Sequence, residues 1–254
     1  IEGSNKQFTD IKTLFNSQVT KNNFKDEINW LRDNSDSNDI SFIFYNGHGT
    51  HRDTIDPIRE NEANDECFSL YDKIYRDDHF ADDISKIPGT VVVFLDTCKN
   101  HGFVRDVDYI KDTWTAENII MFTCHSEHQN NYAVLNLEIP LFTLSIISSF
   151  MQNSIGSELT VEEFYDNLEP DYDEVKDIFG ISYQQGAHIY PEKGSLEYNE
   201  IKNMVLLKGI NNQKPRQTEI NYDCNRRGKM DITTDLIDPD NDDIELYISW
   251  GDRG

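Results

Sequence analysis

Three stretches of almost continuous apolar residues stand out in the first half of the chain. They are 40–45 (ISFIFY), 90–96 (TVVVFLD) and 118–124 (NIIMFTC), and amphipathic segments separate them. Strands that are apolar at successive positions are typical of a parallel sheet with both faces buried, whereas strict alternation marks a strand with one wet face. The pattern therefore predicts an α/β fold in which a mostly parallel central sheet lies between two layers of helices.

Helical spacing appears between these runs. In 20–33, Thr20 stands at an N-cap position and apolar residues recur at helical spacing. A second start signal is Thr160 followed three residues later by Glu163, which is the capping-box pattern. The other expected segments are a polar loop at 51–66, a short strand at 67–72, a loop that becomes a helix at 77–87, and a helix at 139–152.

The pattern changes near residue 210. From there the chain is polar, and short alternating stretches flank a turn rich in Asp, Asn and Pro, which is typical of β-sandwich sequences. We therefore expect two parts, a main domain at 1–210 and the start of a β-sandwich module at 211–254.

The amino-acid composition limits the classes of molecule that the protein is expected to bind. The chain has 47 acidic and 23 basic residues and a formal net charge of −24. Such a charge argues against nucleic acid and anionic membranes as partners and favours cationic substrates, divalent cations or an extracellular setting. No run approaches the ~20 apolar residues of a membrane helix. The four cysteines are too few for a disulfide scaffold, although one pair can still be bridged.

Two of the apolar strands are followed by residues capable of nucleophilic catalysis. His48 comes shortly after 40–45, and Cys98 comes directly after 90–96. Ligand sites of parallel sheets lie beyond the carboxyl ends of the strands. A thiol has a pKa of about 8.5, so a cysteine nucleophile needs a base such as imidazole nearby. Backbone N–H groups at Gly49 and Cys98 are natural donors to a developing oxyanion.

The motifs YNGHGT and FLDTCKNHGF resemble those of the caspase-like cysteine peptidases, in which the histidine stands about 50 residues before the cysteine. Among these, NDECFSLYD, YRDDHF and QQGAHIYPEKG are most similar to segments of metacaspases and their prokaryotic relatives. The resemblance covers roughly 15–195. It implies a caspase-like three-layer sandwich, with His48 as general base, Cys98 as nucleophile, and Gly49 and Cys98 as oxyanion donors.

The same resemblance implies a specificity pocket and a metal site. Asp96 matches an aspartate that lines an acidic S1 pocket selecting Arg or Lys at P1, and Cys124 and Ser126 border that pocket. Four positions match calcium-binding aspartates of metacaspases; the alternative is an acidic loop that is simply solvated. These positions are Asp65, Asp77, Asp78 and Asp106.

Two departures from the family pattern accompany the resemblance. The loop after Cys98 is one residue longer, and the opening central strand of the family is not recognisable before Phe8, which suggests a fragment of a longer protein. At the other end, DLIDPDNDDIELYISWGDRG resembles PKD-like, immunoglobulin-type modules of surface proteins. That resemblance implies an extracellular or cell-surface location.

The leading hypothesis is therefore a secreted or surface cysteine endopeptidase that acts as a monomer on peptides or proteins with a basic P1 residue and does not bind nucleic acid.

 Two alternatives stay open. One is a legumain-like peptidase that prefers Asn or Asp at P1, against which an acidic pocket would argue. The other is a non-catalytic surface or adhesion module whose aspartates only hold calcium.

Overall fold

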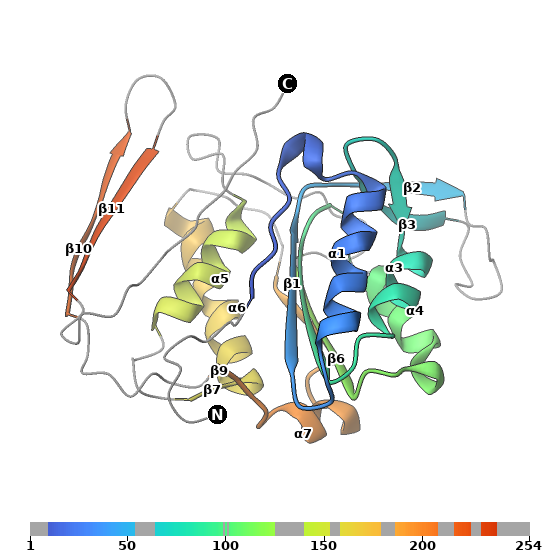
Figure 1. The fold of residues 1–254 in the computed structure, drawn as a ribbon. Helices are drawn as coiled ribbons and strands as arrows, with labels where there is room; N and C mark the ends of the chain where they lie inside the picture. The colour runs from blue at the N-terminus through green and yellow to red at the C-terminus, as the bar shows by residue number, and fades with distance from the viewer. Residues whose placement is uncertain are drawn as a thin grey trace.

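The computed structural model of the chain describes residues 10–53, 64–98, 100, 102–124, 140–152, 158–178, 186–207, 216–224 and 230–237. Its central sheet has the strand order β1-β5-β6-β8 (Figure 1). The strands are β1 (Ile40–Asn46), β5 (Thr90–Asp96), β6 (Asn118–Thr123) and β8 (His188–Tyr190). β1, β5 and β6 are parallel and β8 is antiparallel to β6, so the prediction of a mostly parallel sheet is confirmed.

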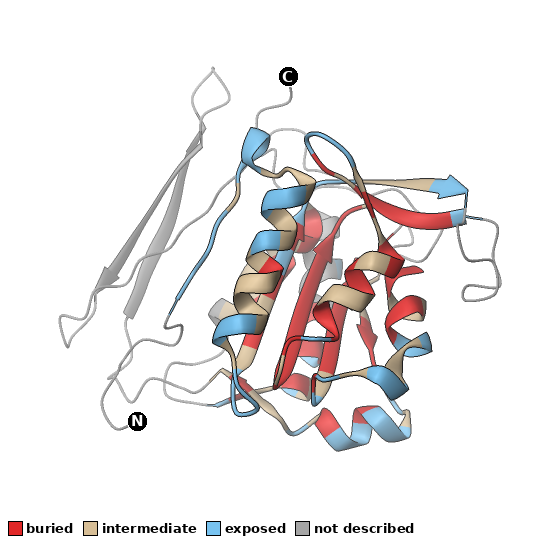
Figure 2. Ribbon diagram, turned by 45° about the vertical axis from the view of Figure 1, so that its right-hand side comes forward, coloured by how far each residue is buried: buried red, intermediate tan, exposed pale blue. Residues whose placement is uncertain are grey.

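Helices cover both faces of this sheet (Figure 1). On one side lie α1 (Lys21–Asn34), α3 (Asp77–Ile84) and α4 (Gly102–Tyr109), and on the other lie α5 (Leu141–Gln152) and α6 (Val161–Ile178). The alternation along β5 explains the two layers. Val91, Val93 and Leu95 pack into the core under α1, α3 and α4, whereas Val92 and Phe94 pack into the core under α5 and α6. Every residue of β5 is buried, as Figure 2 shows for the sheet interior in red.

Two predicted helix starts are confirmed. The Thr20 hydroxyl accepts a hydrogen bond from the Asn23 N–H at 3.2 Å, and α1 begins at the next residue, Lys21. The Thr160 hydroxyl accepts from the Glu163 N–H at 3.2 Å, while the Glu163 carboxylate accepts from the Thr160 N–H at 3.0 Å. This reciprocal pair is the capping box that the sequence pattern indicated.

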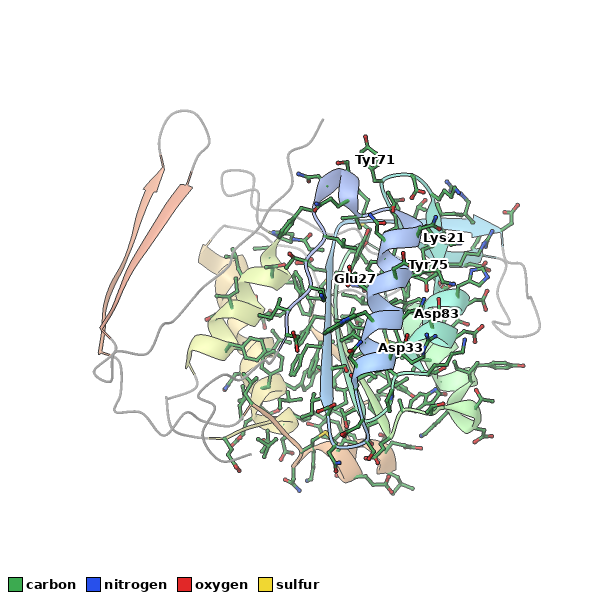
Figure 3. All side chains as sticks on the ribbon, viewed as in Figure 1. Lys21, Glu27, Asp33, Tyr71, Tyr75 and Asp83 are labelled. Carbon is green, nitrogen blue, oxygen red and sulfur yellow. The ribbon has the colours of Figure 1, made fainter. Side chains whose placement is uncertain are left out.

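Helix α1 is tied to the neighbouring α3 by charge as well as by apolar packing. Lys25 Nζ lies 2.9 Å from Asp83 Oδ2, and the hydroxyl of Tyr75 donates to the same carboxylate. Lys21 Nζ lies 5.5 Å from the centre of the Tyr75 ring. The labelled side chains of Lys21, Tyr75 and Asp83 follow the α1 edge in Figure 3. These contacts fix α1 on the face of the sheet that also carries α3.

The prediction of a polar loop at 51–66 is partly wrong. Its described ends are strands: β2 (His48–Asp53) pairs antiparallel with β3 (Asn64–Ser69), which pairs in turn with β4 (Ile74–Arg76). The expected strand at 67–72 is the second half of β3. Backbone hydrogen bonds build this small sheet, and its buried positions include the polar residues Asp65 and Glu66. The small sheet therefore lacks the alternation of apolar and polar residues by which strands are predicted from sequence.

The remaining elements are short or lie in the C-terminal part. They are η1 (Asn16–Gln18), η2 (Lys111–Thr113), β7 (Leu159–Thr160), α7 (Leu196–Ile201), β9 (Val205–Leu207), β10 (Arg216–Cys224) and β11 (Met230–Ile237). β10 and β11 form an antiparallel pair, but the boundary near 210 and the turn beyond 237 lie outside the described residues. The β-sandwich module thus stays a prediction. None of the described helices is long and apolar enough to cross a membrane.

Candidate active site

The parallel pairing of β1 with β5 brings the histidine and cysteine motifs to one edge of the sheet. The two strands stay in register to their last residues, where Asn46 lies opposite Asp96. His48 and Cys98 each follow two residues later, so equal offsets place both beyond the same carboxyl edge. The Gly47 N–H donates to the Asp96 carbonyl oxygen at 3.2 Å and continues the pairing beyond the strands.

Gly49 is the point of closest approach between the two motifs. A Cβ atom at this position would lie 2.1 Å from the Cys98 carbonyl oxygen and 2.6 Å from the Thr97 hydroxyl oxygen. No side chain fits there without moving the backbone beside the cysteine. The main chain that follows His48 therefore lies against the main chain of Cys98. His48 is exposed and Cys98 is partly exposed, so substrate can reach both.

The longer loop after Cys98 is held by a buried amide. Asn100 is fully buried, and its Nδ2 donates to the Leu95 carbonyl oxygen at 2.7 Å and lies 3.2 Å from the Cys124 sulfur. These contacts tie the loop to the ends of β5 and β6. The sequence analysis missed this residue, because an asparagine after a strand is an ordinary turn residue until its burial is known.

Cys124 lies at the same edge but is suited to a structural role. Its side chain is fully buried, and burial, with a smaller contribution from the nearby Asp96 carboxylate, raises the pKa of the thiol well above its ordinary value. A neutral buried thiol is a poor nucleophile. Cys67 is buried as well, and none of Cys67, Cys98 and Cys124 forms a disulfide, so Cys98 is the partly exposed thiol of these three. The open question of a bridged pair is thereby answered for these three.

Asp96 is fully buried at the end of β5. Its Oδ2 accepts hydrogen bonds from the Thr143 N–H, at 2.9 Å, and from the Thr143 hydroxyl, in the first turn of α5. A carboxylate is favourable there because of the partial positive charge of a helix N-terminus. Its Oδ1 lies 3.9 Å from the Cys124 sulfur. Two of the three predicted pocket residues are thus neighbours; the third, Ser126, lies outside the described residues.

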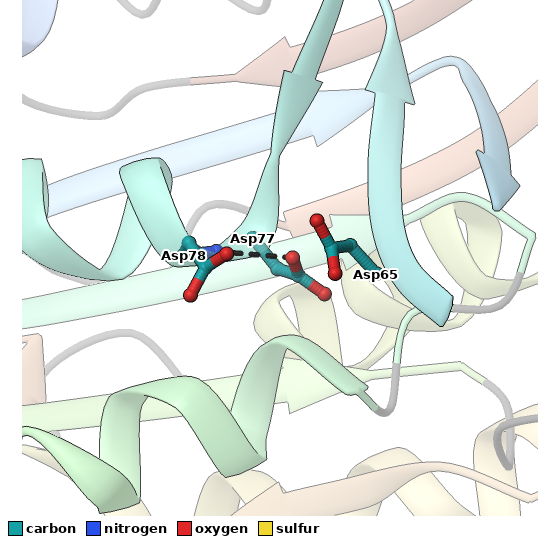
Figure 4. A group of neighbouring side chains, drawn as sticks. All are labelled: Asp65, Asp77 and Asp78. Atoms are coloured by element: carbon teal, nitrogen blue, oxygen red, sulfur yellow. Dashed lines mark hydrogen bonds between the residues drawn. The ribbon is translucent and has the colours of Figure 1, made fainter. Parts of the chain in front are cut away.

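Three of the four predicted calcium ligands come together. Carboxylate oxygens of Asp65, Asp77 and Asp78 lie within 4.8 Å of one another, and all three residues are buried. Figure 4 shows the carboxylates of Asp65 and Asp77 facing each other, with the Asp78 N–H donating to Asp77 Oδ1 at 3.0 Å. Asp106 is buried in α4 and does not belong to this group. The four predicted ligands are therefore not one cluster.

The donor set of this cluster fits a hard divalent cation. Calcium takes oxygen ligands, and carboxylates buried side by side need compensating positive charge to stay ionised. Arg76 supplies part of it through an ion pair with Asp65 Oδ2. Asp65 Oδ1, in contrast, accepts no hydrogen bond within the described part of the chain. The buried triad can hold a metal ion, and its chemistry alone does not select which ion.

Comparisons with known proteins bear on the family and on the fold. A family model described as the caspase domain, Peptidase_C14, matches residues 6–205. Among solved structures, the chain is similar to that of a structural genomics protein from Geobacter sulfurreducens. The TM-score is 0.54 with 16% sequence identity, and the match covers 75% of this chain and 80% of the other. At that identity the likeness supports the fold alone. No curated protein matches the chain.

Proposed function

The chain belongs to the caspase domain family, and on that basis we propose that it is a cysteine peptidase with Cys98 as nucleophile and His48 as general base. One observation carries the proposal most directly: the space for a Gly49 side chain is taken by the Cys98 carbonyl group, so the histidine and cysteine motifs meet. Cys98 is also the accessible thiol among the described free cysteines.

The proposed mechanism uses these groups in the usual order of acyl transfer. His48 takes the thiol proton, and the Cys98 thiolate attacks the scissile carbonyl carbon. The backbone N–H groups of Gly49 and Cys98 stabilise the oxyanion that forms. His48 then gives its proton to the leaving amine, whose C–N bond breaks. Water, deprotonated by His48, finally hydrolyses the thioester and releases the second product.

We extend the proposal to substrates with Arg or Lys at P1, with Asp96 as the selecting carboxylate. Its support is a buried negative charge at the end of β5, beside the nucleophile loop. A buried carboxylate that lines a P1 pocket penalises a neutral or acidic P1 side chain, because such a side chain brings it no positive charge. The competing preference for Asn or Asp at P1 would need a pocket without this charge. The Thr143 contacts occupy Asp96 Oδ2, so a P1 cation would approach the Oδ1 side.

The proposal includes a calcium ion held by Asp65, Asp77 and Asp78. When bound, the ion would, together with Arg76, balance the charge of three buried carboxylates and so stabilise the small sheet and the start of α3 that carry them. An extracellular or surface location, a monomeric state and peptide or protein partners belong to the same proposal. The caspase domain match supports the peptide or protein partners. The net charge of −24 and the surface-module motif of the tail support the location.

The first experiment is hydrolysis of fluorogenic peptides with Arg, Lys, Asn or Asp at P1, each in calcium and in chelator. We expect cleavage after Arg and Lys, and no cleavage by Cys98→Ala, whose melting temperature should match that of the wild type. Retained turnover in Cys98→Ala would overturn the mechanism. Cleavage after Asn would overturn the basic specificity but keep the nucleophile. No cleavage of any peptide would favour a non-catalytic binding module.

A further inference from the structure

Glu66 is a buried carboxylate that the mechanism above does not use. It lies in β3 directly after Asp65 of the acidic cluster, and its side chain is 4% exposed. Burial of a charge is costly unless the charge is paired. Its partner across the small sheet is His51, which lies opposite it in the β2–β3 register, and His51 Nε2 lies 3.2 Å from Glu66 Oε1. This contact is an ion pair when His51 is protonated, and it involves one of the two carboxylate oxygens.

The second carboxylate oxygen lies against the start of α4. A Cβ atom at Gly102, the first residue of α4, would lie 1.8 Å from Glu66 Oε2. A negative charge at a helix N-terminus is favourable because the first N–H groups of the helix point toward it. Gly102 is thus a glycine because the Glu66 carboxylate occupies the space beside it.

The main chain of Glu66 is fixed from the opposite direction. Its N–H donates to Asp77 Oδ2 at 2.7 Å, and Asp77 is the first residue of α3. Glu66 therefore connects the acidic cluster, through its backbone, to the start of α4, through its carboxylate. Because α4 begins four residues after Cys98, the position of its first turn limits where the cysteine segment can lie.

We propose that Glu66 is a positioning residue that anchors the N-terminus of α4 and thereby holds Cys98 at the distance from His48 that catalysis needs. This proposal rests on the proposed peptidase function. Its physical basis is that small displacements of a nucleophile cost much rate, about 100-fold for 1 Å. Glu66 itself touches neither the substrate nor the reacting atoms in this assignment.

The test is Glu66→Gln, with Glu192→Gln at an exposed position as the matched control. We expect kcat of Glu66→Gln to fall about 10- to 100-fold while KM changes less than about twofold, because the binding surface is unchanged. Glu192→Gln should retain both constants. Assays run well below the melting temperature of each variant, measured in parallel, so that loss of folded protein is not counted as loss of rate. An unchanged kcat in folded Glu66→Gln would overturn the proposal.

A double-mutant cycle tests the contact itself. Gly102→Ala should lower kcat in the wild-type background, because its methyl group meets the Glu66 carboxylate. In a Glu66→Ala background the same methyl group has room, so the additional loss should shrink about tenfold or more. Equal effects of Gly102→Ala in both backgrounds would show that the two side chains do not act together and would overturn the proposal.

Alkylation by iodoacetamide separates this proposal from the peptidase proposal. The rate of Cys98 modification, followed by mass spectrometry of the Cys98-containing peptide after quenching and digestion, requires no peptide substrate. We expect Glu66→Gln to change that rate at least about threefold relative to wild type and Glu192→Gln. If no peptide is cleaved, the peptidase proposal fails, and the alkylation rates still decide whether Glu66 positions Cys98. Equal rates in all three proteins would count against positioning.

Discussion

At Gly49, the absence of a side chain allows the two halves of the site to meet. The carbonyl group of Cys98 occupies the space where a Cβ atom would be. The same residue was expected from the sequence to donate its N–H to the oxyanion, a role that requires close backbone approach. The contact therefore gives a steric reason for glycine at this position, independent of catalysis.

Gly49→Ala should lower both stability and activity. Forcing a methyl group into a filled space costs typically about 1–3 kcal/mol, and relief requires that the Cys98 peptide move. We expect a lower melting temperature and a fall in kcat/KM of about tenfold or more. Gly186→Ala is the matched control, since a Cβ atom there meets nothing within 4 Å. Equal behaviour of the two variants would contradict the close contact.

Among the elements, α5 is linked to the end of β5 by a carboxylate as well as by apolar packing. Asp96 receives both the backbone N–H and the hydroxyl of Thr143, in the first turn of α5. This contact connects the end of β5, just before Cys98, to α5 on the face of the sheet opposite α4. Asp96 was expected to select the substrate, and the structure adds a helix contact to that expected role.

Thr143→Val tests this attachment with little change of shape. The substitution removes the hydroxyl donor and keeps the backbone N–H. Hydrogen bonds to charged groups contribute about 1.5–3 kcal/mol, so we expect a loss of that order in the free energy of unfolding. Chemical denaturation provides the measurement. Thr115→Val, at an exposed position, should change it by less than about 0.5 kcal/mol. A loss no larger than that of Thr115→Val would show that the contact does not anchor α5.

For the whole molecule, the dominant property is excess negative charge. With a net charge of −24 the folded chain repels itself, and the buried triad of Asp65, Asp77 and Asp78 concentrates that repulsion at one place. A cation that binds the triad would strongly favour the folded state, because the unfolded chain does not hold Asp65 beside Asp77 and Asp78. Its binding free energy would then add to the stability of the fold.

Calcium should therefore raise the melting temperature. At a free concentration of 100 times Kd, binding to the folded state adds about 2.7 kcal/mol. The shift should disappear in Asp78→Asn and persist in Asp33→Asn, an exposed aspartate in α1. Sodium chloride at matched ionic strength controls for general screening of charge. An equal shift with sodium chloride, or in Asp78→Asn, would show that calcium acts without a specific site.

The sheet layers and the two chemical motifs can be predicted from local patterns along the chain. Continuous apolar runs such as 90–96 require burial on both faces, and capping patterns such as Thr160 with Glu163 act within one turn. His48 and Cys98 were recognisable because each follows a buried strand within a few residues. All these signals are local, so they can be recognised from the sequence without the three-dimensional structure.

Which distant residues meet depends on how the elements pack in three dimensions. The contact of Gly49 with the Cys98 carbonyl, the attachment of Asp96 to Thr143, and the position of Glu66 against Gly102 each join segments that are far apart in sequence. The separation of Asp106 from the aspartate triad was decided in the same way. Polar residues become buried when folding supplies their partners, and the partners are set by strand register and helix packing rather than by any local pattern.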